Sequence, residues 1–276
     1  MDLTCKAGPR QSVNICQFDY SLVVGRAATV QERDSKRLKL DGQTIDLWLA
    51  PLDSATAWSL RMADTLSTDE AERAQDFHFA DDRARFIATR GILRDLVSRY
   101  IGCSPVQVQF EYQLNGKPQL GQALRRTIDL RFNLSHCAAA ALYAFSGGRE
   151  VGVDIELIRR TNPFDRLASR FFTRGEIAKL QQWPVDQRSV GFFTCWTRKE
   201  AYAKAQGQGL SLPFDAFEVS AGPREAAKLV TAPDLEETKR WRLWDIPLDK
   251  SLAGALAAEG RPRRWRLFHY FCLPRQ

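Results

Sequence analysis

The sequence predicts an α+β fold, in which strands paired as hairpins combine with separate helices. Residues 44–52, 131–145 and 151–158 show the alternation of side chains, with a period of two, that is typical of strands. Residues 81–102 instead repeat apolar residues with the helical period. The chain has 276 residues, 44% of them hydrophobic, which is enough to build a core for two modest domains or one large one.

The first half of the chain is expected to form strands and helices in a mixed order. Residues 1–43 show little periodicity, and we expect a poorly ordered extension there. A strand at 44–52 precedes a short helix at 55–64 and another that begins at Ser67 or Thr68. The long helix at 81–102 follows, then a strand at 106–112 that the turn Asn115–Pro118 ends. Residues 131–145 form two strands that lead into 151–158.

The second half is predicted to be helical first and then to form strands. A helix before Phe172 and a second one after it are separated by a turn, and Thr173 with Glu176 forms a capping box for the second. The next helix covers residues 192–207 and is ended by two glycines and Pro213. Short strands follow, from which we expect a second small sheet containing Val219, Trp244 and Leu256.

Composition restricts the partners and the compartment. The net charge of +7 and the sequence pI of about 9.2 favour an anionic partner, such as nucleic acid, an acidic protein or a phosphorylated small molecule. No apolar run is long enough to span a membrane, and the first residues lack a secretion signal. The six cysteines show no zinc-binding or redox spacing. We therefore expect reduced thiols in a cytoplasmic protein with no membrane partner.

Three carboxylates and a lysine stand out in two segments. Along the strand 151–158, Asp154 and Glu156 share one face, about 7 Å apart. In the later helix, Trp196, Glu200 and Lys204 recur at helical spacing on one side. Hard oxygen ligands grouped in this way suit Mg²⁺ at a phosphate-handling site. The alternative is a solvated acidic pair beside an ordinary surface ion pair.

With these residues, the chain resembles the Sfp-type 4′-phosphopantetheinyl transferases. The signature of that family is a G-[IV]-D-[IV]-E strand followed by a helix reading [FW]-x-x-K-E-x-x-x-K. Residues 152–156 match the strand, and Trp196, Lys199, Glu200 and Lys204 match the helix. Shorter matches support the resemblance over residues 45–260: ERAQDFHF at 72–79, GKP at 116–118, FNLSH at 132–136 and GLSLP at 209–213.

The resemblance implies a fold and a reaction. The fold would be two pseudo-twofold-related α/β subdomains, each a small, mostly antiparallel sheet packed with helices, at residues 44–149 and 150–276. Coenzyme A would bind in the cleft between them. The implied enzyme transfers the 4′-phosphopantetheine group from coenzyme A to a serine of an apo acyl or peptidyl carrier protein and releases adenosine 3′,5′-bisphosphate. The carrier would present an acidic helix, and the enzyme would be a monomer.

The resemblance also assigns roles to residues. Asp154, Glu156 and Glu200 would hold Mg²⁺, Glu200 would take the serine proton, and Lys204 would steady the pyrophosphate or the leaving group. The 3′-phosphate and adenine side of coenzyme A would be gripped by Arg73, Lys117, Ser135 and His136. From the residues alone, Lys117 is either an exposed turn lysine or a cation that reaches into a cleft.

One departure from the family pattern concerns the phosphate grip. Glu70 stands where some members carry a second cation, so Arg83, Arg85 or Arg90 would have to join Arg73. Two other function classes remain open at this level. A basic nucleic-acid-binding protein would explain the charge but leaves the carboxylate strand without a purpose. A Mg²⁺-dependent phosphohydrolase would use the same three carboxylates.

Overall fold

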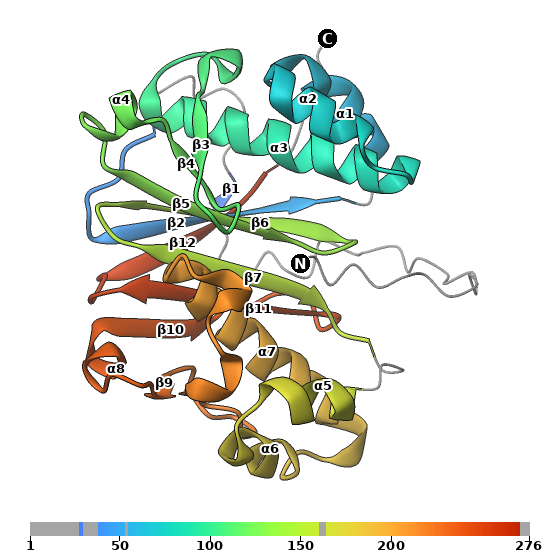
Figure 1. The fold of residues 1–276 in the computed structure, drawn as a ribbon, viewed down its shortest axis with the longest axis vertical. Helices are drawn as coiled ribbons and strands as arrows, with labels where there is room; N and C mark the ends of the chain where they lie inside the picture. The colour runs from blue at the N-terminus through green and yellow to red at the C-terminus, as the bar shows by residue number, and fades with distance from the viewer. Residues whose placement is uncertain (1–27, 30–37, 53–54, 160–163, 271–276) are drawn as a thin grey trace.

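Two sheets lie face to face between two layers of helices in this computed structural model, which describes residues 28–29, 38–52, 55–159 and 164–270 (Figure 1). One sheet has five strands, in the order β1 (Ala28–Thr29), β12 (Arg264–His269), β2 (Thr44–Pro51), β6 (Ala140–Gly147) and β5 (Leu130–His136). The other has three, in the order β10 (Trp241–Asp245), β11 (Leu252–Glu259) and β7 (Val151–Leu157). The predicted α+β class is therefore confirmed.

The helices of the first half cover the outer face of the five-stranded sheet (Figure 1). They are α1 (Ala55–Met62), the 3₁₀ helix η2 (Ala63–Thr65), α2 (Thr68–Gln75) and the long α3 (Ala80–Ile101). Apolar side chains of α3 such as Leu93 and Leu96 pack there against Tyr143 and Phe145 of β6. A hairpin follows α3, made of β3 (Phe110–Tyr112) and β4 (Pro118–Leu120), and the short helix α4 (Gln122–Arg125) comes after it.

The helices of the second half cover the outer face of the three-stranded sheet (Figure 1). These are α5 (Phe164–Phe171), α6 (Arg174–Leu180), the 3₁₀ helix η4 (Val185–Gln187) and the long α7 (Arg188–Ala205). The predicted capping box at the start of α6 is present, with the Thr173 hydroxyl accepting from the Glu176 amide at 3.1 Å. Smaller elements complete this half: η5 (Gly209–Ser211), η6 (Phe214–Ala216), β8 (Glu218–Val219), β9 (Leu229–Thr231) and α8 (Glu236–Arg240).

Strand β7 has the alternation that the sequence predicts. Val151, Val153 and Ile155 lie in the apolar layer between the two sheets, packed with residues such as Leu47 and Leu142. The opposite face of β7 carries Gly152 and Asp154 and is covered by α7, so it is buried rather than open to solvent. The strand is therefore held on both faces, and its carboxylates are presented to a helix.

Gly152 permits the close contact between β7 and α7. A Cβ at this position would lie 2.1 Å from the Ala201 carbonyl oxygen and 2.3 Å from the Ala205 amide nitrogen, both of them helix backbone. Backbone atoms cannot move aside individually, so a larger residue would force the whole helix away from the strand. The distance between the carboxylates of β7 and those of α7 therefore depends on this glycine.

We expect the substitution Gly152→Ala to destabilise the protein by about 1–3 kcal/mol or more, as overpacking in a core does. It should also reduce activity, because it separates the two elements that carry the candidate site. Thermal unfolding and a transfer assay would measure the two effects. Gly147→Ala is the matched control, since a Cβ there meets nothing closer than 3.5 Å. Equal stability of the two variants would contradict the expectation.

Two local predictions need correction. Residues 106–112 do not form one strand: the 3₁₀ helix η3 (Pro105–Gln107) occupies the start, and only β3 is extended. The reason is a capping box between Ser104 and Gln107, and the Arg94 guanidinium takes up the Val108 carbonyl at 2.8 Å. Trp244 and Leu256 do pair in the second sheet, but Val219 belongs to the separate ribbon formed by β8 and β9.

The last strand crosses the predicted boundary at residue 150. β12 runs parallel to β2 and lies in the five-stranded sheet, not with the strands that precede it in sequence. The chain thus begins and ends its described course in the same sheet. The division into 44–149 and 150–276 stays a prediction, with β12 as an element of the second segment that packs on the first. Of the predicted N-terminal extension, residues 1–27 and 30–37 lie outside the described residues.

Candidate active site

Asp154, Lys204 and Ser135 form a hydrogen-bonded group where β7, α7 and β5 meet. The Lys204 ammonium donates to Asp154 Oδ1 at 2.6 Å and to the Ser135 hydroxyl at 2.9 Å. Ser135 in turn donates to the same Asp154 oxygen at 2.8 Å. Asp154 is only 3% exposed and Ser135 only 7%, so the contacts are largely shielded from water. The surface-pair alternative is therefore wrong for Lys204, whose ion-pair partner is Asp154.

The other two predicted carboxylates belong to the same electrostatic neighbourhood. Burial and the negative charge of Asp154 raise the pKa of Glu156 to about 7, against the opposing effect of Lys204. Burial likewise raises the pKa of Glu200 to about 7, with Lys204 opposing and Asp154 adding to the shift. Burial disfavours the charge of Lys204, yet Asp154, Glu200 and Glu156 outweigh it and raise the pKa of the ammonium. The Lys204 ammonium therefore interacts electrostatically with all three acids.

The acids of this cluster offer oxygen donors of the kind that a divalent cation binds. Asp154 Oδ2 is buried and accepts no hydrogen bond within the described structure, so one oxygen of the central carboxylate lacks a partner. An unpartnered buried carboxylate oxygen is costly unless a cation or a donor reaches it. The three acids also share a single ammonium, and carboxylate oxygens are the ligands that Mg²⁺ prefers. Within the described ranges, no group of three or more His, Cys, Asp or Glu side chains is placed so that it could hold a metal ion.

The Lys117 side chain is buried, and its ammonium has hydrogen-bond partners. Its side chain is 8% exposed, and its Nζ donates to the Lys204 carbonyl at 3.0 Å and to Glu150 Oε2 and the Val151 carbonyl at 3.3 Å each. The residue thus lies close to the candidate site but is directed at its backbone. The interpretation of Lys117 as an exposed turn lysine is wrong.

Arg73 of α2 and Arg90 of α3 lie close to the same aromatic ring. The guanidinium of each lies 5.7 Å from the centre of the Phe86 ring, and that of Arg90 also lies 5.4 Å from the Tyr112 ring. Arg73 is exposed, whereas Arg90 is 8% exposed and its buried NH1 atom has no hydrogen-bond partner in the described structure. His136 is exposed at the end of β5, next to Ser135.

The other two arginines predicted as partners of Arg73 each have a contact elsewhere. Arg83 donates to the Phe77 carbonyl at 3.2 Å, and Arg85 pairs with Asp82 at 2.9 Å. Glu70, which departs from the family pattern, is buried with Arg94 at 2.5 Å. The ion pair of this acid with Arg94 therefore joins α2 to α3. Arg90 is the arginine that lies beside the same ring as Arg73.

Sequence reasoning missed the role of Lys199, which stands directly before Glu200. Lys199 is fully buried, and its ammonium donates to both oxygens of Glu176, at 2.7 and 2.8 Å, and to the Phe217 carbonyl at 2.7 Å. Glu176 also accepts from the Val219 amide at 2.8 Å. This pair fixes the rotation of α7, and hence the direction of Glu200. The capping box was a visible signal for Glu176, but no local pattern pairs it with Lys199.

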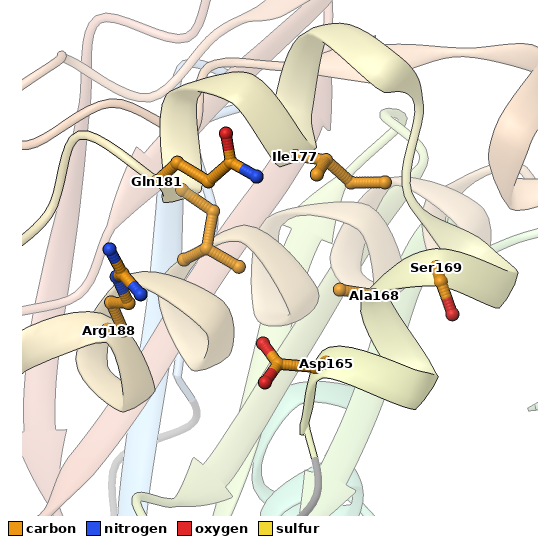
Figure 2. Close-up of a pocket in the computed structure, with 7 residues that line it drawn as sticks. Asp165, Ala168, Ser169, Ile177, Gln181 and Arg188 are labelled. Atoms are coloured by element: carbon orange, nitrogen blue, oxygen red, sulfur yellow. The ribbon is translucent and has the colours of Figure 1, made fainter. Parts of the chain in front are cut away.

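A cavity of about 260 Å³ lies among helices of the second half of the chain (Figure 2). Its lining comes from α5, α6 and the first turn of α7, with Asp165 and Arg188 among its polar side chains. None of the predicted site residues contributes to it, so it is not the candidate active site.

No helix in the described part of the chain is both long and apolar enough to cross a membrane.

Comparison with known proteins matches both halves of the chain. A model of the 4′-phosphopantetheinyl transferase superfamily matches residues 150–258, and a model of the N-terminal part of 4′-phosphopantetheinyl transferases matches residues 52–146. The first match contains the strand with Asp154 and Glu156 and the helix with Glu200 and Lys204.

Individual relatives extend over most of the chain. The 4′-phosphopantetheinyl transferase HetI of a Nostoc species is 39% identical over 233 residues, covering 84% of this chain and 95% of that protein. The 4′-phosphopantetheinyl transferase Sfp of Bacillus subtilis is 30% identical over 160 residues, covering 58% of this chain and 68% of that protein. A solved holo-(acyl-carrier-protein) synthase of Bacillus anthracis, in complex with CoA (3′,5′-ADP), aligns with a TM-score of 0.32 and 25% identity, covering 40% of this chain and 94% of that chain.

Proposed function

This chain belongs to the 4′-phosphopantetheinyl transferase family, and we propose that Asp154, Glu156 and Glu200 form the Mg²⁺ site of its reaction. As a member of the family, it transfers the 4′-phosphopantetheine group from coenzyme A to a serine of an apo acyl or peptidyl carrier protein. Coenzyme A and the carrier are therefore its substrates. The observation that supports the metal site most directly is the buried, unpartnered Oδ2 of Asp154 within a group of acids.

The reaction exchanges one phosphorus–oxygen bond for another. The serine hydroxyl oxygen of the carrier attacks the phosphorus that bears the pantetheine, and the bond from this phosphorus to the bridging pyrophosphate oxygen breaks. The products are the holo carrier protein and adenosine 3′,5′-bisphosphate. Negative charge accumulates on the leaving phosphate, and phosphoryl transfer is accelerated mainly by positioning the reactants and stabilising this charge. A bound Mg²⁺ supplies part of that stabilisation.

The protein side chains have separate roles in this scheme. Glu200 accepts the proton of the serine hydroxyl, directly or through a water molecule. A general base must lie within hydrogen-bonding reach of the proton that it accepts. The Lys204 ammonium stabilises the negative charge of the leaving group. Asp154 and Ser135 hold this ammonium in place. Asp154 therefore orients the lysine through one oxygen and offers the other to the metal.

We assign the 3′-phosphate of coenzyme A to Arg73 and Arg90, together with His136 at the end of β5. Support comes from the shared Phe86 ring and from the unpartnered NH1 of Arg90, a donor that a phosphate oxygen would satisfy. Arg83 and Arg85 are engaged elsewhere, which argues for Arg90 as the second cation. Ser135 is withdrawn from the phosphate grip in this scheme, because its hydroxyl bonds Asp154 and Lys204.

The net charge of +7 fits a carrier protein that presents an acidic helix, since opposite charges accelerate association. We further propose that the enzyme acts as a monomer, because the two sheets and their helices enclose apolar cores within one chain. A cytoplasmic location is proposed from the six cysteines, which show no zinc-binding or redox spacing. Neither a phosphohydrolase nor a nucleic-acid-binding protein is supported by the relatives.

The test is a carrier modification assay with the full-length protein. We expect a panel of apo carrier proteins from fatty-acid, polyketide and peptide synthetases to include one that gains the mass of phosphopantetheine with coenzyme A and Mg²⁺. Chelation of the metal should abolish the gain. Release of adenosine 3′,5′-bisphosphate without any carrier would indicate a phosphohydrolase instead, and modification that persists in the chelator would reject the metal site.

A further inference from the structure

The hairpin formed by β3 and β4 reaches from the first half of the chain to the end of α7. At its tip, the Asn115 amide donates to the Gly207 carbonyl at 2.6 Å. From the same turn, Lys117 donates to the Lys204 carbonyl at 3.0 Å. Gln113 lies so close that a Cβ on Gly207 would be 2.9 Å from its amide oxygen. Three residues of one turn thus contact the end of a helix that lies about ninety positions further along the chain.

This is the end of the helix where the candidate site lies. The last carbonyl groups of an α-helix have no partners within the helix, and a cation at this end also interacts favourably with the helix dipole. α7 ends at Ala205, so the Lys204 carbonyl is one of these groups. It accepts from the Gly207 amide at 3.2 Å and from the Lys117 ammonium. The backbone of Lys204 is thus held by Lys117, while its side chain is held by Asp154 and Ser135.

Lys117 also holds the strand that carries Asp154. Its second and third contacts are the Val151 carbonyl, at the start of β7, and Glu150 just before it. An ammonium has three donors, and all three of Lys117 are filled by these contacts. With the side chain 8% exposed, the Lys117 ammonium could bind a ligand only by giving up one of these three contacts.

We propose that Lys117 is a positioning residue, which sets the last turn of α7 against the start of β7 and so places the Lys204 ammonium, rather than a contact for coenzyme A. The inference rests on the proposed role of Lys204 in the transfer. Its physical basis is that misplacing a charged group by about 1 Å can cost on the order of a hundredfold in rate. The effect should therefore appear in turnover and not in the affinity for coenzyme A.

The experiment is a steady-state analysis of Lys117→Met with coenzyme A, Mg²⁺ and an accepted carrier. We expect kcat to fall by about tenfold to a hundredfold, while KM for coenzyme A changes by less than about twofold, as for a group that acts only in the transition state. The matched control is Lys179→Met, which also removes a lysine paired with a glutamate, at 2.9 Å, in α6. A raised KM with unchanged kcat, or no change in either, would overturn the proposal.

A second measurement separates positioning from a general loss of structure. In a Lys204→Arg background, Lys117→Met should reduce kcat by less than about threefold, because residues that act as one unit are strongly non-additive. A full multiplicative loss in the double variant would show that Lys117 acts independently of Lys204 and would overturn the proposal. If Lys117→Met does not fold, Asn115→Ala should give a smaller loss of kcat at constant KM, and an unchanged kcat there overturns the proposal. Failure of the wild type to modify any carrier would instead refute the proposed function.

Discussion

The variant Glu200→Gln should lose turnover while keeping part of its binding of coenzyme A. The amide cannot accept the serine proton, and general base catalysis contributes about a hundredfold to ten-thousandfold to a rate. Asp154 and Glu156 would still be present as metal ligands, and the arginines assigned to the 3′-phosphate belong to other helices, α2 and α3. We therefore expect kcat to fall by at least about a hundredfold and the dissociation constant for coenzyme A to change by only a few-fold.

Two measurements check this expectation. Single-turnover transfer to a carrier protein reports the chemical step, and calorimetric titration with coenzyme A and Mg²⁺ reports binding. Glu236→Gln is a suitable control, since this glutamate side chain is 71% exposed and pairs only with Lys239 among the contacts described. Turnover like that of the wild type in Glu200→Gln would reject its assignment as the base. Complete loss of coenzyme A binding would mean that Glu200 acts chiefly in assembling the site.

The variant Asp154→Ala should need much more Mg²⁺ for activity. This change removes both the proposed metal ligand and the partner of Lys204 and Ser135. We expect the Mg²⁺ concentration for half-maximal rate to rise by more than about tenfold, which corresponds to a loss of about 1.4 kcal/mol of binding free energy. The protein should also lose stability, because removing one partner of a buried pair costs about 3–5 kcal/mol at most sites of this kind.

Magnesium titration of the rate, with thermal unfolding measured on the same samples, separates the two effects. Asp129→Ala is the control: its side chain is 63% exposed and, among the residues that the structure describes, forms a surface ion pair with Arg131 alone, at 3.0 Å. An Mg²⁺ dependence equal to that of the wild type would remove Asp154 from the metal site. A loss of stability without such a shift would leave the aspartate as a structural partner of Lys204.

Much of the local structure could be read from neighbouring residues. The alternation in β7 follows from its strand period, and the capping box of α6 lies within four consecutive residues. The end of α7 at Ala205 is followed closely by Gly207, whose positive φ of 70° is one that glycine adopts easily. Each of these features depends on contacts within a few positions, where a periodic or turn pattern is visible.

The sequence singles out the charged residues of the candidate site as candidates, but not the contacts between them. Glu200 and Lys204 were expected to be on one side of a helix and Asp154 and Glu156 on one side of a strand, and their mutual influence is present in the folded chain. Lys204 forms hydrogen bonds with Asp154 and Ser135, and Lys117 donates to the backbone of α7. These contacts join residues that are 50 to 87 positions apart. No periodic pattern encodes such distances.

The sequence by itself determined which chemical groups this protein has and which local elements carry them, because strand alternation, helix spacing and capping depend on nearest neighbours. Only the tertiary structure decided how those groups are oriented. It placed β12 back beside β2, paired Lys199 with Glu176 and joined Arg90 to Arg73 over Phe86. The physical reason is that burial and packing between distant segments select a partner for each charged group, and an unpaired charge inside the protein costs too much to persist.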